Sequence, residues 1–400
     1  MRTQPLLLLA AVAAAPFPPP SASNFFLYFG ANGTGPVDSA PSLALASRGA
    51  LAGYGWQANA APSNYTHGEA NLQAAAAALH AAAPALPVFV YRHFQMCWPL
   101  FDVQRAASAA RTPADEALFL HDSDNAPGGV LCRQGIPGGG TAPLFAFANT
   151  SAGAFWVQHV VAELAAEPPL VAAVFFDETD WSACGYSFAK DGCSSISSAY
   201  RAQDLLAKLP ALRATVDALG AAGKWPILSS KNLLAAAWQG LPDSTPRPCV
   251  IPHDAYAQAM AGADWGRFYE FWMGTSSPAE NAATIANALL EGAAGVGLVA
   301  RAPADAAAQC AEACPQGSVS KTPQDFALAA FLVARTSPWS YFGVSAGWYS
   351  QCWCWQEAYD RAALCGEAAA PAVRTGLYSW SREYSGCSVR VNTSDSTGSF

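Results

Sequence analysis

Charged residues are scarce in this chain of 400 residues: they make up 12% of it, and the net charge at pH 7 is −8. No basic patch is visible, which argues against a nucleic acid or an anionic membrane as a partner. Histidine is also rare, with six residues, so there is little material for a metal centre. We therefore expect no metal and no other cofactor.

Several catalytic motifs are missing as well. The chain contains no H-E-x-x-H or P-loop sequence, so zinc peptidases and nucleotide hydrolases lose their usual support. No G-x-G-x-x-G follows the first expected strand, and the glycine run at 138–140 has no helix behind it. A nucleotide-binding fold is therefore disfavoured.

Long hydrophobic runs are absent after the N-terminus. The chain opens with Arg2, an apolar run from Leu6 to Ala15, and then small residues and prolines up to Ser23. This pattern is typical of a secretory signal, because the apolar run is too short to span a bilayer. We predict a signal peptide over residues 1–23, cleaved near Ala15 or Ser23. We expect a secreted or secretory-lumen protein that is monomeric and not membrane-bound.

Cysteine, in contrast, is plentiful, with eleven residues. In an oxidising compartment most of them should form disulfides and an odd one should remain, with the connectivity left open. Cys184 with Cys193, and Cys310 with Cys314, lie in two predicted loops. A zinc site built from residues 310, 314, 352 and 354 is the less favoured alternative, because secretion favours bridges. The N-x-S/T sequons, compatible with glycosylation, are Asn32, Asn64, Asn149 and Asn392.

Apolar strand-like runs alternate with alanine- and leucine-rich helical runs, the pattern of βα units around a parallel sheet. The expected strands are Phe25–Phe29, Leu51–Trp56, Val88–His93, Leu144–Phe147, Val171–Asp177, Pro226–Ser229, Arg267–Trp272, Val296–Arg301 and Trp339–Val344. The expected helices are Glu69–Ala83, Ala152–Ala166, Ala199–Ala222, Pro278–Gly292 and Thr322–Thr336.

This number of units favours an α/β fold, a (β/α)8 TIM barrel over residues 24–375 with inserted disulfide-bearing loops. A doubly wound open sheet is the alternative. In residues 376–400 the pattern changes to short strand-like segments, Leu377–Trp380 and Ser388–Asn392, joined at Ser385-Gly386. We expect a short C-terminal β-hairpin or small β appendage there.

The most informative run is VFFDETDW, from Val174 to Trp181. Ionised carboxylates are costly to bury, so a strand that ends in acids should end at a solvent-filled mouth. If Phe175 and Asp177 share a face by the two-residue period, Glu178 points the other way, with Asp180 in the loop beyond. The alternative is that these acids cap a turn or pair with an arginine.

A second carboxylate, Glu270, lies inside the aromatic run from Arg267 to Trp272. In a buried strand it must be paired, protonated or facing a pocket, and a buried pair with Arg301 or Arg92 is the alternative. Two strands that each present a carboxylate to one mouth are what glycosidic cleavage requires, because one group protonates the leaving oxygen while the other attacks or activates water.

Other polar and aromatic residues follow the ends of expected strands and could hydrogen-bond or stack on a sugar. Each has a structural alternative, such as a helix cap at 230–232 or simple aromatic packing. The residues expected to bind substrate are Arg92, His93, Glu178, Asp180, Trp181, Lys231, Asn232, Tyr269, Trp272, Arg301 and Trp348.

Two stretches resemble a family of glycosyl hydrolase-like TIM barrels similar to endo-α-1,4-polygalactosaminidases. The first runs from Phe147-Ala148-Asn149-Thr150 through Phe155-Trp156-Val157 to the strand Ala173–Glu178. The second is Leu364-Cys365-Gly366 with Pro371, then Trp380–Tyr384 and Val389–Asn392. The resemblance implies a barrel with an aspartate after strand four, here Asp177, and a glutamate after strand six, here Glu270, as the catalytic pair. Ala172-Ala173 replaces the family's usual Asp-Gly.

The sequence therefore predicts a secreted glycoside hydrolase that cleaves an oligo- or polysaccharide with Asp177 and Glu270. Two alternatives remain. One is a carbohydrate-binding barrel without catalysis, and the other is a metal-dependent hydrolase or lyase that uses Asp177, Asp180 and His93.

Overall fold

A computed structural model describes most of the chain. The described residues are 25–29, 48–54, 68–110, 116–126, 129–135, 141–166, 170–179, 196–230, 253–269, 272–273, 277–303, 324–336, 339–345 and 357–400.

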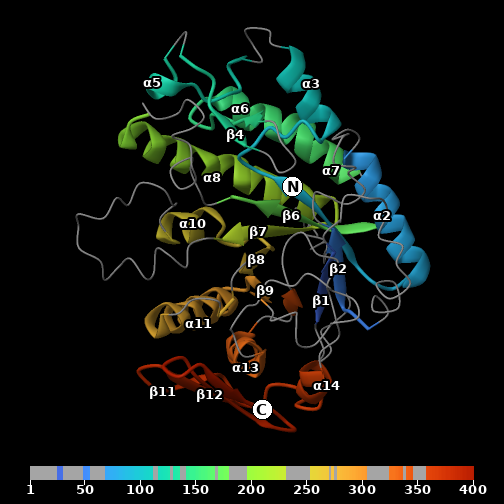
Figure 1. The fold of residues 1–400 in the computed structure, drawn as a ribbon, viewed down its shortest axis with the longest axis vertical. Coiled ribbons are helices and arrows are strands. Elements are labelled where there is room, and N and C mark those ends of the chain that lie inside the picture. Colours follow the sequence, from blue (N-terminus) through green and yellow to red (C-terminus); the bar gives the residue numbers. More distant parts are fainter. Residues whose placement is uncertain are drawn as a thin grey trace, which may run out of the picture.

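Eight parallel strands form the central barrel (Figure 1). In order round the barrel they are β1 (Phe26–Phe29), β2 (Leu51–Tyr54), β3 (Val88–His93), β6 (Val171–Asp177), β7 (Trp225–Ser230), β8 (Gly266–Tyr269), β9 (Gly297–Pro303) and β10 (Ser340–Ser345). A parallel bridge between Phe25 and Phe342 brings the first strand against the last. The predicted (β/α)8 fold is confirmed.

Helices separate the strands and cover the outside of the barrel. They begin where the sequence offers caps: the hydroxyl of Ser197 accepts a hydrogen bond from the Tyr200 N–H, and Ser277 caps the next long helix, which has Pro278 in its first turn. The helices are α2 (Gly68–Ala82), α3 (Asp102–Ala110), α5 (Asp122–Asn125), α6 (Thr150–Phe155), the π-helix η1 (Trp156–Val161), α7 (Ala162–Ala166), α8 (Ser198–Ala221), α10 (His253–Ala259), α11 (Pro278–Ala293), α13 (Gln324–Ala334) and α14 (Glu357–Ala363).

Aromatic side chains fill the inside of the barrel. The Phe175 ring lies 5.6 Å from that of Tyr91 and 4.6 Å from that of Phe268, measured between ring centroids. Trp225 fills the end where the strands begin, and glycines at the start of β8 and β9 leave room for it. A Cβ on Gly266 would lie 2.4 Å from the Trp225 ring. The interior is thus a packed core with polar groups confined to its ends.

One predicted strand is wrong. Residues 144–147 do not join the barrel, although they form an apolar run. Leu144 and Phe145 form only isolated antiparallel bridges, with Met96 and Phe119. They belong to the long connection between β3 and β6, which also holds the two-stranded ribbon β4 (Arg133–Gly135) and β5 (Thr141–Pro143). The hydrophobic run is explained by packing: Phe145 and Phe147 are buried against Trp156 and Phe94.

The C-terminal appendage is a four-stranded antiparallel sheet of β11 (Val373–Gly376), β12 (Ser379–Glu383), β13 (Ser388–Asn392) and β14 (Thr397–Ser399). It packs on α13 at the bottom of Figure 1. Arg382 donates hydrogen bonds to carbonyls at the end of α13, and Tyr384 donates to the carbonyl of Leu332 at 2.6 Å. The sheet therefore also caps a barrel helix.

The cysteines are partly accounted for by the described residues. Cys365 and Cys387 form a disulfide that ties the end of α14 to the turn between β12 and β13. Cys132 is also disulfide-bonded, and Cys97 is free and buried. The expected loops at Cys184–Cys193 and Cys310–Cys314, like the alternative zinc site, lie outside the described residues. Among the helices that are described, none is both long and apolar enough to cross a membrane.

Candidate active site

The inner face of the barrel can be followed through the strand register. His93 pairs with Asp177, and Tyr91 pairs with Phe175. Paired residues of neighbouring parallel strands share a face, so His93 and Asp177 lie on the same inner face as the packed ring of Phe175. Both residues end their strands, and the carboxyl ends of the strands are the end where barrel enzymes hold their active sites. Asp177 is half-buried there.

Asp177 accepts a hydrogen bond on each of its carboxylate oxygens. The hydroxyl of Tyr91 donates to Oδ2 at 2.9 Å, and the backbone N–H of Glu178 donates to Oδ1 at 2.9 Å. The backbone carbonyl of Asp177 accepts from the N–H of Phe94 at 2.9 Å, which extends the ladder between β3 and β6. The carboxylate is therefore held from two sides in a fixed orientation.

Glu178 leaves the strand in an unusual conformation. Its φ is +54°, in the left-handed region that costs energy for a residue with a Cβ. Its side chain returns towards β3, where Oε2 lies 3.4 Å from Nε2 of His93. The other ring nitrogen of His93, Nδ1, accepts the N–H of Met96 at 3.0 Å. A neutral His93 therefore carries its proton on Nε2, facing Glu178.

Aromatic rings wall this cluster on the β3 side. Trp98, in the connection after β3, lies with its ring centroid 6.2 Å from that of Tyr91 and 5.9 Å from that of His93, both edge to face. Two residues after Asp177, Thr179 is fully buried and its hydroxyl donates to the carbonyl of Ser229 at 2.6 Å. The segment after β6 is thus anchored to both neighbouring strands.

Arg301 also lies on the inner face. It follows Val299 by two positions on β9, and Val299 pairs with Phe268, whose ring contacts that of Phe175. Arg301 pairs with Gly343 on β10, so its neighbour on that strand leaves space beside it. The predicted position of Arg301 near the mouth is compatible with this register.

Arg92 requires a correction. It pairs with Phe176, on the outward face, and is completely buried between the barrel and its helices. Its Nη2 lies 3.4 Å from the Glu163 carboxylate on α7, and its guanidinium stacks 4.1 Å from the ring centroid of Phe101. Adjacent strand residues point to opposite faces, so Arg92 and His93 could not both face the mouth. Arg92 has no access to a substrate there.

Tyr269 and Trp272 require the same correction. Tyr269 is buried and its hydroxyl donates to Glu291 of α11 at 2.8 Å, in a network where Nε of Arg267 lies 2.7 Å from the same carboxylate. Trp272 is completely buried, and its indole N–H donates to the carbonyl of Ala327 on α13 at 2.9 Å. Both residues pack between the barrel and its helices and offer no stacking surface to a sugar.

The remaining predicted residues lie outside the part of the chain that the structure describes. They are Glu270, Asp180, Trp181, Lys231, Asn232 and Trp348. The described residues hold no group of three or more histidine, cysteine, aspartate or glutamate side chains that could bind a metal ion. His93, one ligand of the metal-dependent alternative, is engaged through Nδ1 by a backbone N–H.

Sequence reasoning missed two members of the cluster, Tyr91 and Trp98. A signal existed for Tyr91, because it stands two positions before His93 on the same strand and must share its face. Trp98 carries no such signal: it comes from an irregular connection, and its place beside Tyr91 depends on how that connection folds back.

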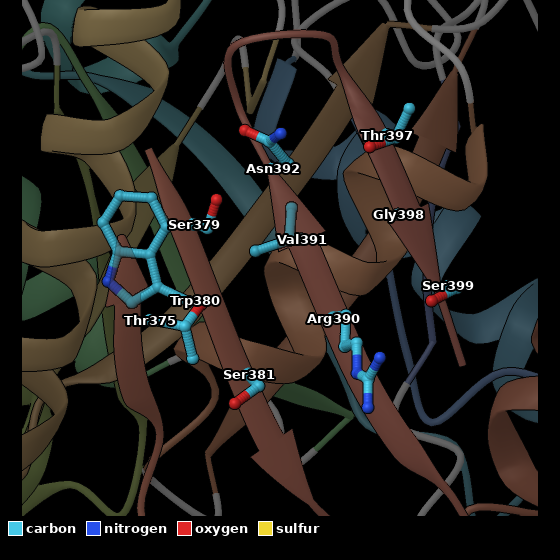
Figure 2. A pocket seen from close by; sticks show the side chains of 10 residues that line it. All are labelled: Thr375, Ser379, Trp380, Ser381, Arg390, Val391, Asn392, Thr397, Gly398 and Ser399. Atoms are coloured by element: carbon cyan, nitrogen blue, oxygen red, sulfur yellow. The ribbon is translucent and has the colours of Figure 1, made fainter. Parts of the chain in front are cut away.

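A separate pocket of about 470 Å³ lies on the C-terminal sheet (Figure 2). Its lining residues, all within the described part of the chain, are Thr375, Ser379, Trp380, Ser381, Arg390, Val391, Asn392, Thr397, Gly398 and Ser399. They supply hydroxyls and one guanidinium but no carboxylate. This pocket therefore lacks the groups needed for glycosidic cleavage, and the candidate active site remains the end of the barrel that holds Asp177.

No family model matches the chain, and no curated protein matches its sequence. Among solved structures, trehalose-6-phosphate hydrolase from Bacillus licheniformis is 8% identical with a TM-score of 0.43, covering 80% of this chain and 64% of its own length. Eubacterium rectale Amy13B is 10% identical with a TM-score of 0.46, covering 94% and 87%. Aspergillus fumigatus Ega3, in complex with galactosamine, is 8% identical with a TM-score of 0.38, covering 84% and 96%. Likenesses at this level do not bear on function, which rests on the residues.

Proposed function

We propose that the protein is a secreted glycoside hydrolase that cleaves glycosidic bonds of an oligo- or polysaccharide with Asp177 and Glu270. The observation that carries the proposal is the placement of Asp177: a half-buried carboxylate on the inner face, at the carboxyl end of the fourth barrel strand, with a donor on each oxygen. A carboxylate set in this way can meet a reacting atom with a fixed lone pair.

Glu270 is the proposed partner because of its place in the chain. It follows Tyr269, the last residue of β8, and comes two positions after Phe268, whose ring contacts Phe175 inside the barrel. If the alternation of the strand continues for one residue, Glu270 reaches the same mouth as Asp177. The sixth strand then supplies one carboxyl group and the fourth supplies the other.

The two groups divide the chemistry between them. Because both oxygens of Asp177 already accept hydrogen bonds, we assign it the role that needs the ionised form. Glu270 then protonates the glycosidic oxygen as the bond to the anomeric carbon breaks. Asp177 either attacks that carbon, forming an ester that water later hydrolyses, or takes a proton from an attacking water. Carboxyl groups about 5–5.5 Å apart suit the first course and about 6.5–9.5 Å the second.

The test is an activity screen of the wild-type protein on a broad panel of polysaccharides, beside Asp177→Asn and Glu270→Gln. Asp177→Asn removes the proposed charge and Glu270→Gln removes the proposed acidic proton, each without changing side-chain size, so product release should fall by roughly a thousandfold or more. Asp217→Asn is the matched control, because Asp217 is an exposed acid on α8 paired with Arg213. It should retain wild-type activity.

Unchanged activity in Asp177→Asn would end the assignment of this residue. Binding to a glycan array with no product from any polysaccharide would instead favour a carbohydrate-binding barrel without catalysis. The secreted state is checked separately, by expression in a eukaryotic host and N-terminal sequencing of protein from the medium. Cleavage near residue 15 or 23 is expected.

A further inference from the structure

Glu178 has a feature that the proposed chemistry does not use. Its backbone is left-handed, with φ of +54°, although glycine would adopt this conformation at no steric cost. Strained residues of this kind persist only where the surrounding structure holds them, and they gather at functional sites. The question is what holds Glu178 and what its conformation achieves.

The conformation is coupled to the direction of one N–H group, because a flip of the peptide between Asp177 and Glu178 changes φ of Glu178 and the direction of its amide together. The Glu178 amide donates to Oδ1 of Asp177 at 2.9 Å, and this bond fixes the carboxylate opposite the Tyr91 hydroxyl, which donates to Oδ2. A rotation of the peptide between the two residues would turn that amide away. The orientation of Asp177 thus depends on the backbone of its neighbour.

The constraint comes from β3. The Glu178 side chain is largely buried, and its Oε2 lies 3.4 Å from Nε2 of His93, which is itself buried. His93 is oriented in turn by the Met96 N–H, which donates to Nδ1 at 3.0 Å and leaves the ring proton on Nε2. An edge-to-face contact with Trp98 limits the tilt of the ring.

We propose that His93 and Glu178 form a positioning pair: the Nε2–H of His93 holds the Glu178 carboxylate, and this holds the left-handed backbone that aims the Glu178 amide at Asp177. Neither side chain reacts with substrate in this role. The inference rests on the proposed function for its catalytic consequence, but the tautomer and the backbone conformation are properties of the protein alone.

Four variants separate the parts of the pair. Glu178→Gly permits φ above zero but removes the anchor, whereas Glu178→Gln keeps an oxygen that can accept from Nε2–H. His93→Gln keeps a donor near the place of Nε2, whereas His93→Asn keeps only an acceptor near the place of Nδ1 for the Met96 N–H. A positioning role predicts that Glu178→Gln retains more activity than Glu178→Gly, and that His93→Gln retains more activity than His93→Asn.

The expected result for Glu178→Gly is a fall in kcat of about tenfold to a hundredfold, with KM changed less than about threefold and a melting temperature no lower than that of the wild type. Loss of mere structure would lower the melting temperature and leave kcat per folded molecule unchanged. A Glu178→Gly variant with wild-type kcat overturns the proposal. Equal activity of the two variants at each position also overturns the proposal.

A measurement that needs no substrate distinguishes failure of the positioning pair from failure of the proposed function. In the full chain labelled with ¹⁵N-histidine, the nitrogen shifts of His93, assigned by comparison with His93→Gln, should report a neutral ring protonated on Nε2. Glu178→Gly should shift that signal. A ring protonated on Nδ1 overturns the pair even if glycans are cleaved, whereas the expected tautomer in a protein that cleaves no glycan supports the pair and rejects only the hydrolase.

Discussion

Tyr91 is the residue through which the third barrel strand reaches Asp177. Its hydroxyl donates to Oδ2 at 2.9 Å, while its ring packs edge to face against Phe175 and Trp98. Tyr91→Phe keeps the ring and removes the donor, so kcat should fall by about tenfold or more, because a hydrogen bond to a charged group contributes about 1.5–3 kcal/mol. Steady-state kinetics on the substrate found in the screen measure the loss.

The matched control is Tyr378→Phe, in the turn between β11 and β12, far along the chain from the candidate site. It should leave kcat unchanged. Tyr378→Phe should unfold within about 1 kcal/mol of the wild type, and Tyr91→Phe should lose at most the about 1.5–3 kcal/mol of its hydrogen bond, because both variants keep their ring packing. A Tyr91→Phe enzyme with wild-type kcat would show that the Glu178 amide alone orients Asp177.

Ser229 offers a test of stability next to the site. It is completely buried, and within the part of the chain that the structure describes its hydroxyl oxygen has no hydrogen-bond partner. Ser229→Ala removes this unsatisfied group, so the free energy of unfolding in denaturant should stay constant or rise by up to about 1 kcal/mol. Thr179→Ala, which loses the 2.6 Å bond to the Ser229 carbonyl, should instead be destabilised by about 1–2 kcal/mol. A large loss in Ser229→Ala would indicate a bound water.

The position of Asp177 could be predicted from the sequence because strand parity and the cost of burying a carboxylate agree. The same parity rule excludes Arg92 from the mouth once His93 is placed on the inner face. The prediction that Tyr269 and Trp272 face the mouth is wrong for a different reason. An aromatic residue at a strand end suits a sugar platform or a helix interface equally well, and only the hydrogen bonds to Glu291 and Ala327 decide between them.

Barrel strands were predicted well at the level of elements because they are buried on both faces. They read as continuous apolar runs, which loops rarely do. The run at 144–147 shows the limit of that rule. It is equally buried, but its neighbours are irregular segments and helix side chains, and burial alone does not specify a ladder of backbone hydrogen bonds. The left-handed turn at Glu178 had no signal either, since glycine is the residue that usually marks one.

The contact between β14 and α13 is close enough to test by adding a single carbon. A Cβ on Gly398 would lie 2.7 Å from the Cβ of Ala329 and 2.8 Å from the backbone oxygen of Asp325. Gly398→Ala should therefore push the sheet from the helix and lower the free energy of unfolding by about 1–3 kcal/mol. Gly376→Ala is the control, because its Cβ would meet Ser379 at 3.6 Å, an ordinary contact. Equal stability of the two variants would show that the sheet docks loosely.

At the scale of the whole molecule, two ion pairs among the described residues join the barrel to the layer of helices around it. Arg92 with Glu163, and Arg267 with Glu291, connect barrel strands to the helices outside them. Burial raises the pKa of Asp204 on α8, while the charge of Lys208 one turn along the helix lowers it. Such pairs are costly to break by removing one partner.

Tyrosine burial gives the molecule a predicted weakness in alkali. Burial raises the pKa of Tyr200 to about 12, and desolvation raises the pKa values of Tyr341, Tyr359 and Tyr384 as well. An unfolded tyrosine titrates near pH 10, so above that pH the unfolded chain binds fewer protons than the folded one. Stability from these groups is complete below pH 10 and is lost as the pH rises through 10 to 12.

We therefore expect the melting temperature to fall steeply over this range, together with the rise of tyrosinate absorbance. Tyr200→Phe should soften the fall without abolishing it, because the other three remain. Full tyrosinate absorbance at pH 11 in a protein that still melts at its neutral-pH temperature would contradict the burial of these hydroxyls.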